Sequence, residues 1–130
     1  MMSRQDSLAL GVVFNEAALR YYPALDRVDQ YVHAHISHPL SLQDAARVAH
    51  LERKYFSAFF RSKVGIPFRE WLRLLRIRRA VELMRVRWEL IPRTAFAAGF
   101  GDVRSFERAF KRVTGMTPEA FRSAIEQASR

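Results

Sequence analysis

The 130-residue sequence has no cysteine, only five glycines and five prolines, and no long apolar run. Because cysteine is absent, a disulfide scaffold, a thiolate metal site and a thiol nucleophile are excluded. The longest early apolar run, from Leu8 to Phe14, is far shorter than the roughly 20 residues that a membrane-spanning helix needs. It also lacks the charged start of a secretory signal. We therefore expect a cytoplasmic protein without a membrane partner.

Acidic residues are scarce relative to basic ones. The chain has 13 Asp and Glu against 22 Lys and Arg, which gives a formal net charge of +9 and a sequence pI near 11.0. Between Glu52 and Arg112, 16 basic and 6 acidic residues leave a net charge of +10, and the rest of the chain carries −1. A focused positive field attracts polyanions, most commonly nucleic acid, although a solvated helix face would have the same composition.

Hydrophobic periodicity predicts helices through nearly the whole chain, and no stretch combines strand-like alternation with a hairpin signal. We therefore expect an all-α fold of about seven helices. The sequence predicts a capping box at Ser41 and Asp44 and a helix cap at Asp102. Gly65 is predicted to end the helix that covers residues 53–63. The expected helices cover about residues 25–37, 42–49, 53–63, 67–87, a short stretch with Pro92 in its first turn that ends at Gly99, 103–114 and 118–127.

The second half of the chain repeats the first. Each copy is a short helix, a tight turn and a longer helix with two phenylalanines on its buried side, which is the layout of a helix-turn-helix motif. The one-residue difference between the copies falls in the turns, residues 50–52 and 99–102. Four pairs are 50 residues apart, Phe56 and Phe106, Phe60 and Phe110, Gly65 and Gly115, Trp71 and Phe121; two are 49 apart, Leu42 and Ile91, Ala46 and Ala95.

The face opposite the phenylalanines is polar or basic in both longer helices. Arginines near the start of a groove-reading helix can donate two hydrogen bonds to guanine, which makes Arg104 and Arg108 the best candidates for reading bases. Glu107 could accept from cytosine, or pair with Arg104 or Lys111 along the helix. The candidates for base reading are Arg53, Lys54, Ser57, Ala58, Val103, Arg104, Ser105, Glu107 and Arg108; those for phosphate contact are Ser41, Arg61, Lys63, Lys111 and Arg112.

The run from Gly99 to Arg122 resembles the signature segment of the AraC/XylS family of bacterial transcription regulators. It has the Gly-Phe opening, the Phe-x-x-x-Phe-Lys spacing and the closing Gly-x-Thr-Pro-x-x-Phe-Arg in order. The positions upstream that are similar to the family's first unit and linker helix are Phe56 to Arg61, Gly65, Trp71, Arg76, Ala80 and Leu83-Met84. The resemblance implies seven helices, with two recognition helices placed in successive major-groove segments of one DNA duplex.

The resemblance also implies a division of the chain. Residues 25–124 are the DNA-binding domain, and residues 1–24 are an N-terminal extension that could be helical. Within the extension, the mildly amphipathic segment from Leu8 to Tyr22 could be a helix packed on the domain, a dimer contact or a vestige. Within that domain the first unit covers about 25–65, the linker helix 67–87 and the second unit 90–124, and residues 125–130 form a tail. The family usually adds an effector or dimerisation domain, so the chain is either a stand-alone regulator or a fragment.

Two further departures affect the first unit. Many family members have a short polar cap where this chain has Glu52, so we expect a less firm start to the first recognition helix. Ala58 stands where an arginine is frequent, so we expect the second unit to carry more base specificity.

Other functions have weaker support. A helical adaptor that binds another regulator or RNA polymerase, with little DNA contact, is the alternative from a different class. No catalytic motif is present, so we expect no enzyme activity and no cofactor. His33, His35 and His38 lie close in sequence, but positions i and i+2 face different sides of a helix, which argues against a metal site. Trp71 and Trp88 are expected in packing positions.

Overall fold

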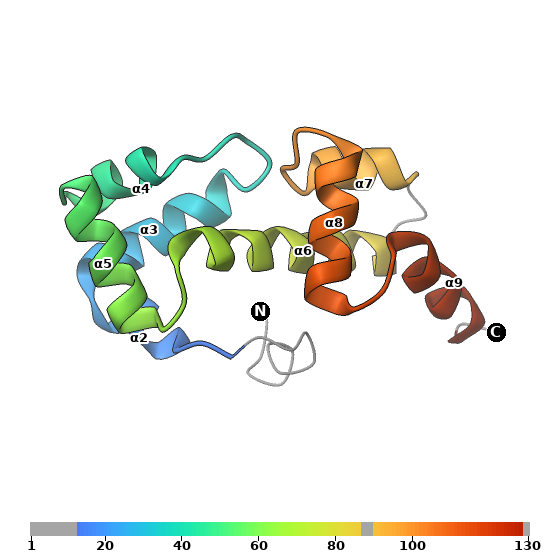
Figure 1. Ribbon diagram of the computed structural model, residues 1–130, viewed down its shortest axis with the longest axis horizontal. Helices are drawn as coiled ribbons and strands as arrows, with labels where there is room; N and C mark the ends of the chain where they lie inside the picture. Colours follow the sequence, from blue (N-terminus) through green and yellow to red (C-terminus); the bar gives the residue numbers. More distant parts are fainter. Residues whose placement is uncertain (1–12, 87–89, 129–130) are drawn as a thin grey trace. The chain divides into compact units, whose positions relative to one another are not determined.

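The computed structural model describes residues 13–86 and 90–128, and within these ranges the chain is all-helical. Seven of the helices correspond to those expected from the sequence, and an additional one, α2, lies before them (Figure 1). None of the described helices combines the length and the apolar character needed to cross a membrane. The helices are α2 Glu16–Tyr21, α3 Pro23–Ala34, α4 Leu42–Ala49, α5 Arg53–Val64, α6 Phe68–Val86, α7 Ile91–Ala97, α8 Val103–Thr114 and α9 Pro118–Ala128.

The chain forms two compact units that divide within α6. The first unit runs from Val13 to Arg73 and contains α2 to α5 with the start of α6. The second unit, residues 74–128 of the described chain, contains the remainder of α6 with α7, α8 and α9. Each unit therefore holds one copy of the repeated motif, α4 with α5 in the first and α7 with α8 in the second.

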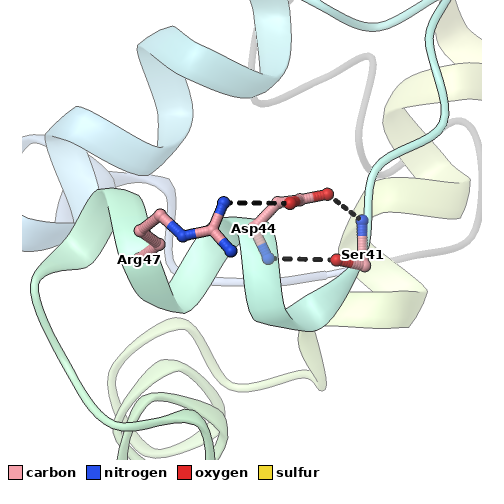
Figure 2. A network of polar contacts seen from close by, with 3 residues as sticks. All are labelled: Ser41, Asp44 and Arg47. Carbon is pink, nitrogen blue, oxygen red and sulfur yellow. Dashed lines mark hydrogen bonds and ion pairs between the residues drawn. The ribbon is translucent and has the colours of Figure 1, made fainter.

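The predicted helix ends are confirmed where a local cap defines them. The Ser41 side chain accepts the Asp44 N–H at 3.0 Å while the Asp44 carboxylate accepts the Ser41 N–H at 3.1 Å, so the capping box is present (Figure 2). Gly65 ends α5 with φ 96°, in the left-handed region that a side chain disfavours. The α8 cap at Asp102 is present as well.

Some predicted ends differ from the observed ones by one to three residues, and α3 begins at Pro23 instead of residue 25. Helix α3 stops at Ala34 instead of residue 37, because the His35 N–H donates to both Tyr31 and Val32 carbonyls and tightens the chain into a turn. Pro67 does not lie in α6 but directly precedes it, and its carbonyl accepts the Trp71 N–H at 3.1 Å. The predicted extension of α6 to residue 87 and the packing of Trp88 fall outside the described residues.

Aromatic side chains form the centre of each unit. Phe56 and Phe60 are fully buried in the first unit, and Phe60 packs against Phe68 and Trp71 with ring centroids 5.5 and 5.2 Å apart. The placement of Trp71 in the core is confirmed, since none of its surface is exposed.

The second unit is built on the equivalent pair. Phe106 and Phe110 are fully buried against Ile77, Ala80 and Met84 of α6. Phe121, the counterpart of Trp71, is only partly buried on this cluster. Leu83 of α6 is half-buried. All four phenylalanines of the repeat are thus core residues, as their spacing predicts.

Candidate nucleic-acid interface

The repeat seen in the sequence is also present in the backbone of the two turns. After α4, the Leu51 N–H donates to the Ala46 carbonyl at 3.0 Å; after α7, the Phe100 N–H donates to the Ala95 carbonyl at 3.0 Å. Both donors and both acceptors are 49 residues apart, the offset found for the shorter helices. The additional residue in the second turn is Gly101. The two motifs therefore share the hydrogen bond that closes the turn between their helices.

Each turn passes through the left-handed region at the same position. His50 has φ 62° and is the only described residue other than glycine with a positive φ, and Gly99 has φ 99°. A β-carbon in this conformation crowds the neighbouring backbone, so the first turn is strained where the second is not. The His50 side chain is exposed.

An acidic side chain begins each of the longer helices. The Asp102 carboxylate accepts the Ser105 N–H at 2.7 Å, and the Glu52 carboxylate accepts the Tyr55 N–H at 3.0 Å. The expectation that Glu52 weakens the start of α5 is therefore wrong: its longer side chain folds back to reach the same helix position. Backbone hydrogen bonds lower both carboxyl pKa values, chiefly the bond from Ser105 to Asp102 and from Lys54 to Glu52.

The side chains proposed to read bases lie on the outer faces of α5 and α8. In α5 this face is exposed throughout, and it is opposite the buried Phe56 and Phe60. In α8 the corresponding face is exposed except for Val103, which is half-buried. The exposed members are Arg53, Lys54, Ser57 and Ala58 in α5 and Arg104, Ser105, Glu107 and Arg108 in α8.

Two side chains of the α8 face, Ser105 and Glu107, differ in their local contacts. The Ser105 hydroxyl donates to the Asp102 carboxylate at 3.1 Å, so it is already used in the cap. Glu107 makes no ion pair with Arg104 or Lys111 among the described contacts, where the helix spacing had allowed either. The Glu107 carboxylate therefore remains available to a partner.

A carboxylate lies at the start of α4, where Ser41 was predicted to contact phosphate. Figure 2 shows the Asp44 carboxylate between the Ser41 backbone and the Arg47 guanidinium, whose Nη1 lies 3.6 Å from Asp44 Oδ1. The bond from the Ser41 N–H is the main cause that lowers the Asp44 pKa. An anionic group thus already occupies the positive end of this helix. Arg47, which the sequence analysis did not single out, is the exposed cation beside it.

The other candidates for phosphate contact differ in how exposed their side chains are. Arg61, Lys111 and Arg112 are exposed. Lys63 is half-buried, and its Nζ lies 5.3 Å from the centre of the Tyr22 ring and 6.0 Å from that of Phe59. Lys63 is therefore engaged in a contact between α5 and the chain before α3.

Histidines provide no metal centre in the part of the chain that is described. No three His, Asp or Glu side chains there gather as ligands of a metal ion would. His33 Nε2 lies 3.2 Å from Asp29 Oδ1, and the His35 ring stacks on Tyr31 with centroids 4.3 Å apart.

Comparison with known proteins agrees with this geometry. Residues 45–124 match the family described as a helix-turn-helix domain. The chain is 33% identical over 100 residues to the regulatory protein PocR of Salmonella typhimurium, covering 77% of this chain and 33% of that protein. The chain spans less than half of the length of the curated relatives that it matches.

Solved structures share the fold. The C-terminal domain of AraT, a response regulator from Geobacillus stearothermophilus, is 28% identical with a TM-score of 0.76, covering 81% of this chain and 88% of that one. The DNA-binding domain of AdpA, a global transcriptional factor solved in complex with a target DNA, has a TM-score of 0.77 and covers 82% of this chain and 95% of that one. At 24% identity, the AdpA likeness establishes the fold alone.

Proposed function

This chain belongs to the AraC/XylS family of helix-turn-helix proteins, and we propose that it is a sequence-specific regulator of transcription that binds double-stranded DNA. One observation carries the proposal. Two motifs with matching turn hydrogen bonds each expose the outer face of their second helix, and those faces carry cations. A helix of this kind fits the major groove, where the edges of all four base pairs differ.

Base reading falls to the outer faces of α5 and α8. Arg104 and Arg108 each have a guanidinium that can donate two hydrogen bonds to guanine O6 and N7, and Glu107 can accept from cytosine N4. Lys54, Ser57 and Arg53 offer polar contacts in α5, where Ala58 contributes only a methyl group. The second unit therefore carries more of the specificity.

Phosphate contacts set the register on the duplex. The exposed Arg61, Lys111 and Arg112 suit this role best, and Arg47 joins them if its weak pair with Asp44 opens on DNA. Lys63 and Ser41 are weaker candidates because each already has a local partner. The assignment of residues 25–124 to one DNA-binding domain, with two units joined by the helix that contains residues 68–86, is part of this proposal.

Such a regulator acts without catalysis or a cofactor, in the cytoplasm where bacterial DNA lies. RNA polymerase is a further partner that activation of transcription would require. A helical adaptor with only weak DNA contact is the competing function, and the two differ in their dependence on salt.

A salt titration of duplex binding separates these functions. Phosphate contacts release condensed counterions, so the affinity of a DNA-binding protein falls steeply between about 50 and 200 mM salt. Lys111→Ala should weaken binding to all sequences alike, whereas Arg104→Ala should relax preference at one base pair. An affinity that does not change with salt, or a sequence preference untouched by Arg104→Ala and Arg108→Ala together, would contradict the proposal.

A further inference from the structure

The C-terminal end of α5 is held by a segment that precedes the helix-turn-helix motif. The last carbonyls of a helix have no partner within the helix and need one from elsewhere. The Val64 carbonyl accepts the backbone N–H of Asn15 at 2.8 Å, and the Lys63 carbonyl accepts the Asn15 side-chain amide at 3.4 Å. Asn15 therefore supplies a cap from 48 residues away in sequence from Lys63.

Aromatic and cation contacts continue this attachment along α5. The Tyr22 ring meets Phe59 edge-to-face with centroids 5.4 Å apart, and Lys63 Nζ lies over both rings. Between Asn15 and Tyr22, Ala18 and Leu19 are buried, with 3% and 6% of their surface exposed. The segment 13–22 thus contacts α5 through Asn15 and through Tyr22.

The corresponding helix end in the second unit is bonded differently. The end of α8 is closed by its own residues: the Gly115 N–H donates to the Lys111 carbonyl at 2.8 Å and the Thr114 hydroxyl to the Phe110 carbonyl at 2.8 Å. In the first unit, by contrast, Arg27 of α3 also donates to the Val48 and Ala49 carbonyls at 3.1 and 3.0 Å, which braces the end of α4. Both helices of the first motif are therefore held from outside it.

We propose that Asn15 and Tyr22 are positioning residues for the first recognition helix: the segment 13–22 fixes the end and the rotation of α5 so that Lys54 and Ser57 meet their base pairs. This inference rests on the proposed DNA-binding function. Glu52 fixes one end of α5 by its cap, and Asn15 fixes the other. Contacts at both ends of a helix restrict its rotation about its axis, and groups that read bases must be held to within a fraction of an ångström.

Substitutions at two adjacent tyrosines test the inference with a matched control. Tyr22→Ala removes the contacts with Phe59 and Lys63, whereas Tyr22→Phe keeps the aromatic ring that makes them. Tyr21→Ala is the control, because Tyr21 is 77% exposed and its ring contacts Tyr22 rather than α5. A preferred site is first selected with the wild type, and binding to single-base variants of that site is measured. Base pairs at which Lys54→Ala loses discrimination are assigned to α5, and those at which Arg108→Ala loses it are assigned to α8.

The expected result is a loss confined to the first unit. Tyr22→Ala should lower discrimination about five- to tenfold at the base pairs defined by Lys54→Ala and leave those defined by Arg108→Ala unchanged. Tyr22→Phe and Tyr21→Ala should both behave as the wild type. An equal loss at both sets, which general destabilisation would produce, or no loss at either set, overturns the inference. If the wild-type chain selects no DNA sequence, the result contradicts the proposed function itself.

Hydrogen exchange of the wild-type chain decides the case in which Tyr22→Ala does not fold. If Asn15 clamps α5, its amide should exchange about as slowly as that of Gly65, which bonds to Arg61 at the same helix end. An Asn15 amide that exchanges like one in an unfolded peptide overturns the inference, whether or not the chain binds DNA.

Discussion

The two helix-turn-helix units share one backbone plan but differ in what they present and how they are held. The α8 face carries Arg104 and Arg108, whereas at the corresponding positions of α5 the first unit has Lys54 and Ala58. The first unit, in turn, is braced by Asn15 and Arg27 from outside its motif. If both faces read bases as we propose, the two units would differ in how much their specificity depends on donors and how much on positioning.

The largest expected effect concerns the cores. Phe60→Ala and Phe110→Ala each remove a fully buried ring and should each lower the free energy of unfolding by about 3–5 kcal/mol. The loss of unfolding free energy should be larger for Phe60→Ala, because the Phe60 ring contacts three other aromatic rings, those of Phe56, Phe68 and Trp71. The Phe110 ring contacts only two, those of Phe106 and the partly buried Phe121, among the described residues. Urea unfolding measures both. Equal losses would show that the two cores are equally well packed.

The second-largest effect is expected when an arginine is removed from the α8 face or added to the α5 face, which should change the sequence specificity of DNA binding. Arg108→Ala should reduce discrimination at one base pair by about 1–3 kcal/mol, because a bidentate contact with guanine is lost. Ala58→Arg places the same side chain at the corresponding exposed position of α5 and should add a preference in the other half of the site. Competition binding with single-base variants measures both changes. If Arg108→Ala lowers affinity equally for all sequences, Arg108 contacts phosphate and not a base.

The strained turn of the first unit gives a smaller effect, of opposite sign in the two units. His50→Gly should stabilise the chain by about 0.5–1 kcal/mol, because glycine accepts the φ of 62° without a steric penalty. Gly99→Ala should destabilise it by about 1 kcal/mol at a φ of 99°. Thermal unfolding reports both. A destabilised His50→Gly variant would mean that the imidazole makes a contact that outweighs the strain.

The acidic caps should give the smallest effect, visible as a dependence of stability on pH. Hydrogen bonds lower the pKa of Glu52 and Asp102 in the folded chain, so each carboxylate stabilises the fold above its unfolded pKa of about 4. That contribution is lost as the pH falls through the lowered folded value. The melting temperature should therefore fall on acidification below about pH 4, and less so in Asp102→Asn and Glu52→Gln. Variants with the full wild-type acid response would contradict the role of these caps.

Local features of the fold were predictable from the sequence. The capping box at Ser41, the Asp102 cap, the glycine at 65 and the four buried phenylalanines each depend on residues within about one or two helical turns. The repeat was detectable because the same residue types recur at a constant offset. The faces of α5 and α8 followed directly, since the side opposite a buried stripe is exposed.

Features that depend on distant residues were not predictable. Arg27 reaches carbonyls 21 and 22 residues away, and the Asn15 side chain reaches one 48 residues away. The same holds for Lys63, whose place over Tyr22 explains why it is half-buried although its charge alone suited a phosphate contact. Glu52 was misjudged for a different reason: residue type suggested a poor cap, and only the fold shows that its longer chain reaches Tyr55.

Selection of bound sites from random duplexes tests most directly whether both units read DNA. The wild-type chain should select two blocks of preferred base pairs with centres about one helical turn, 10 base pairs, apart. Repeated with Lys54→Ala and with Arg108→Ala, the selection should lose preference in a different block for each variant. A single block, or loss of the same block in both variants, would show that only one of the two units recognises sequence.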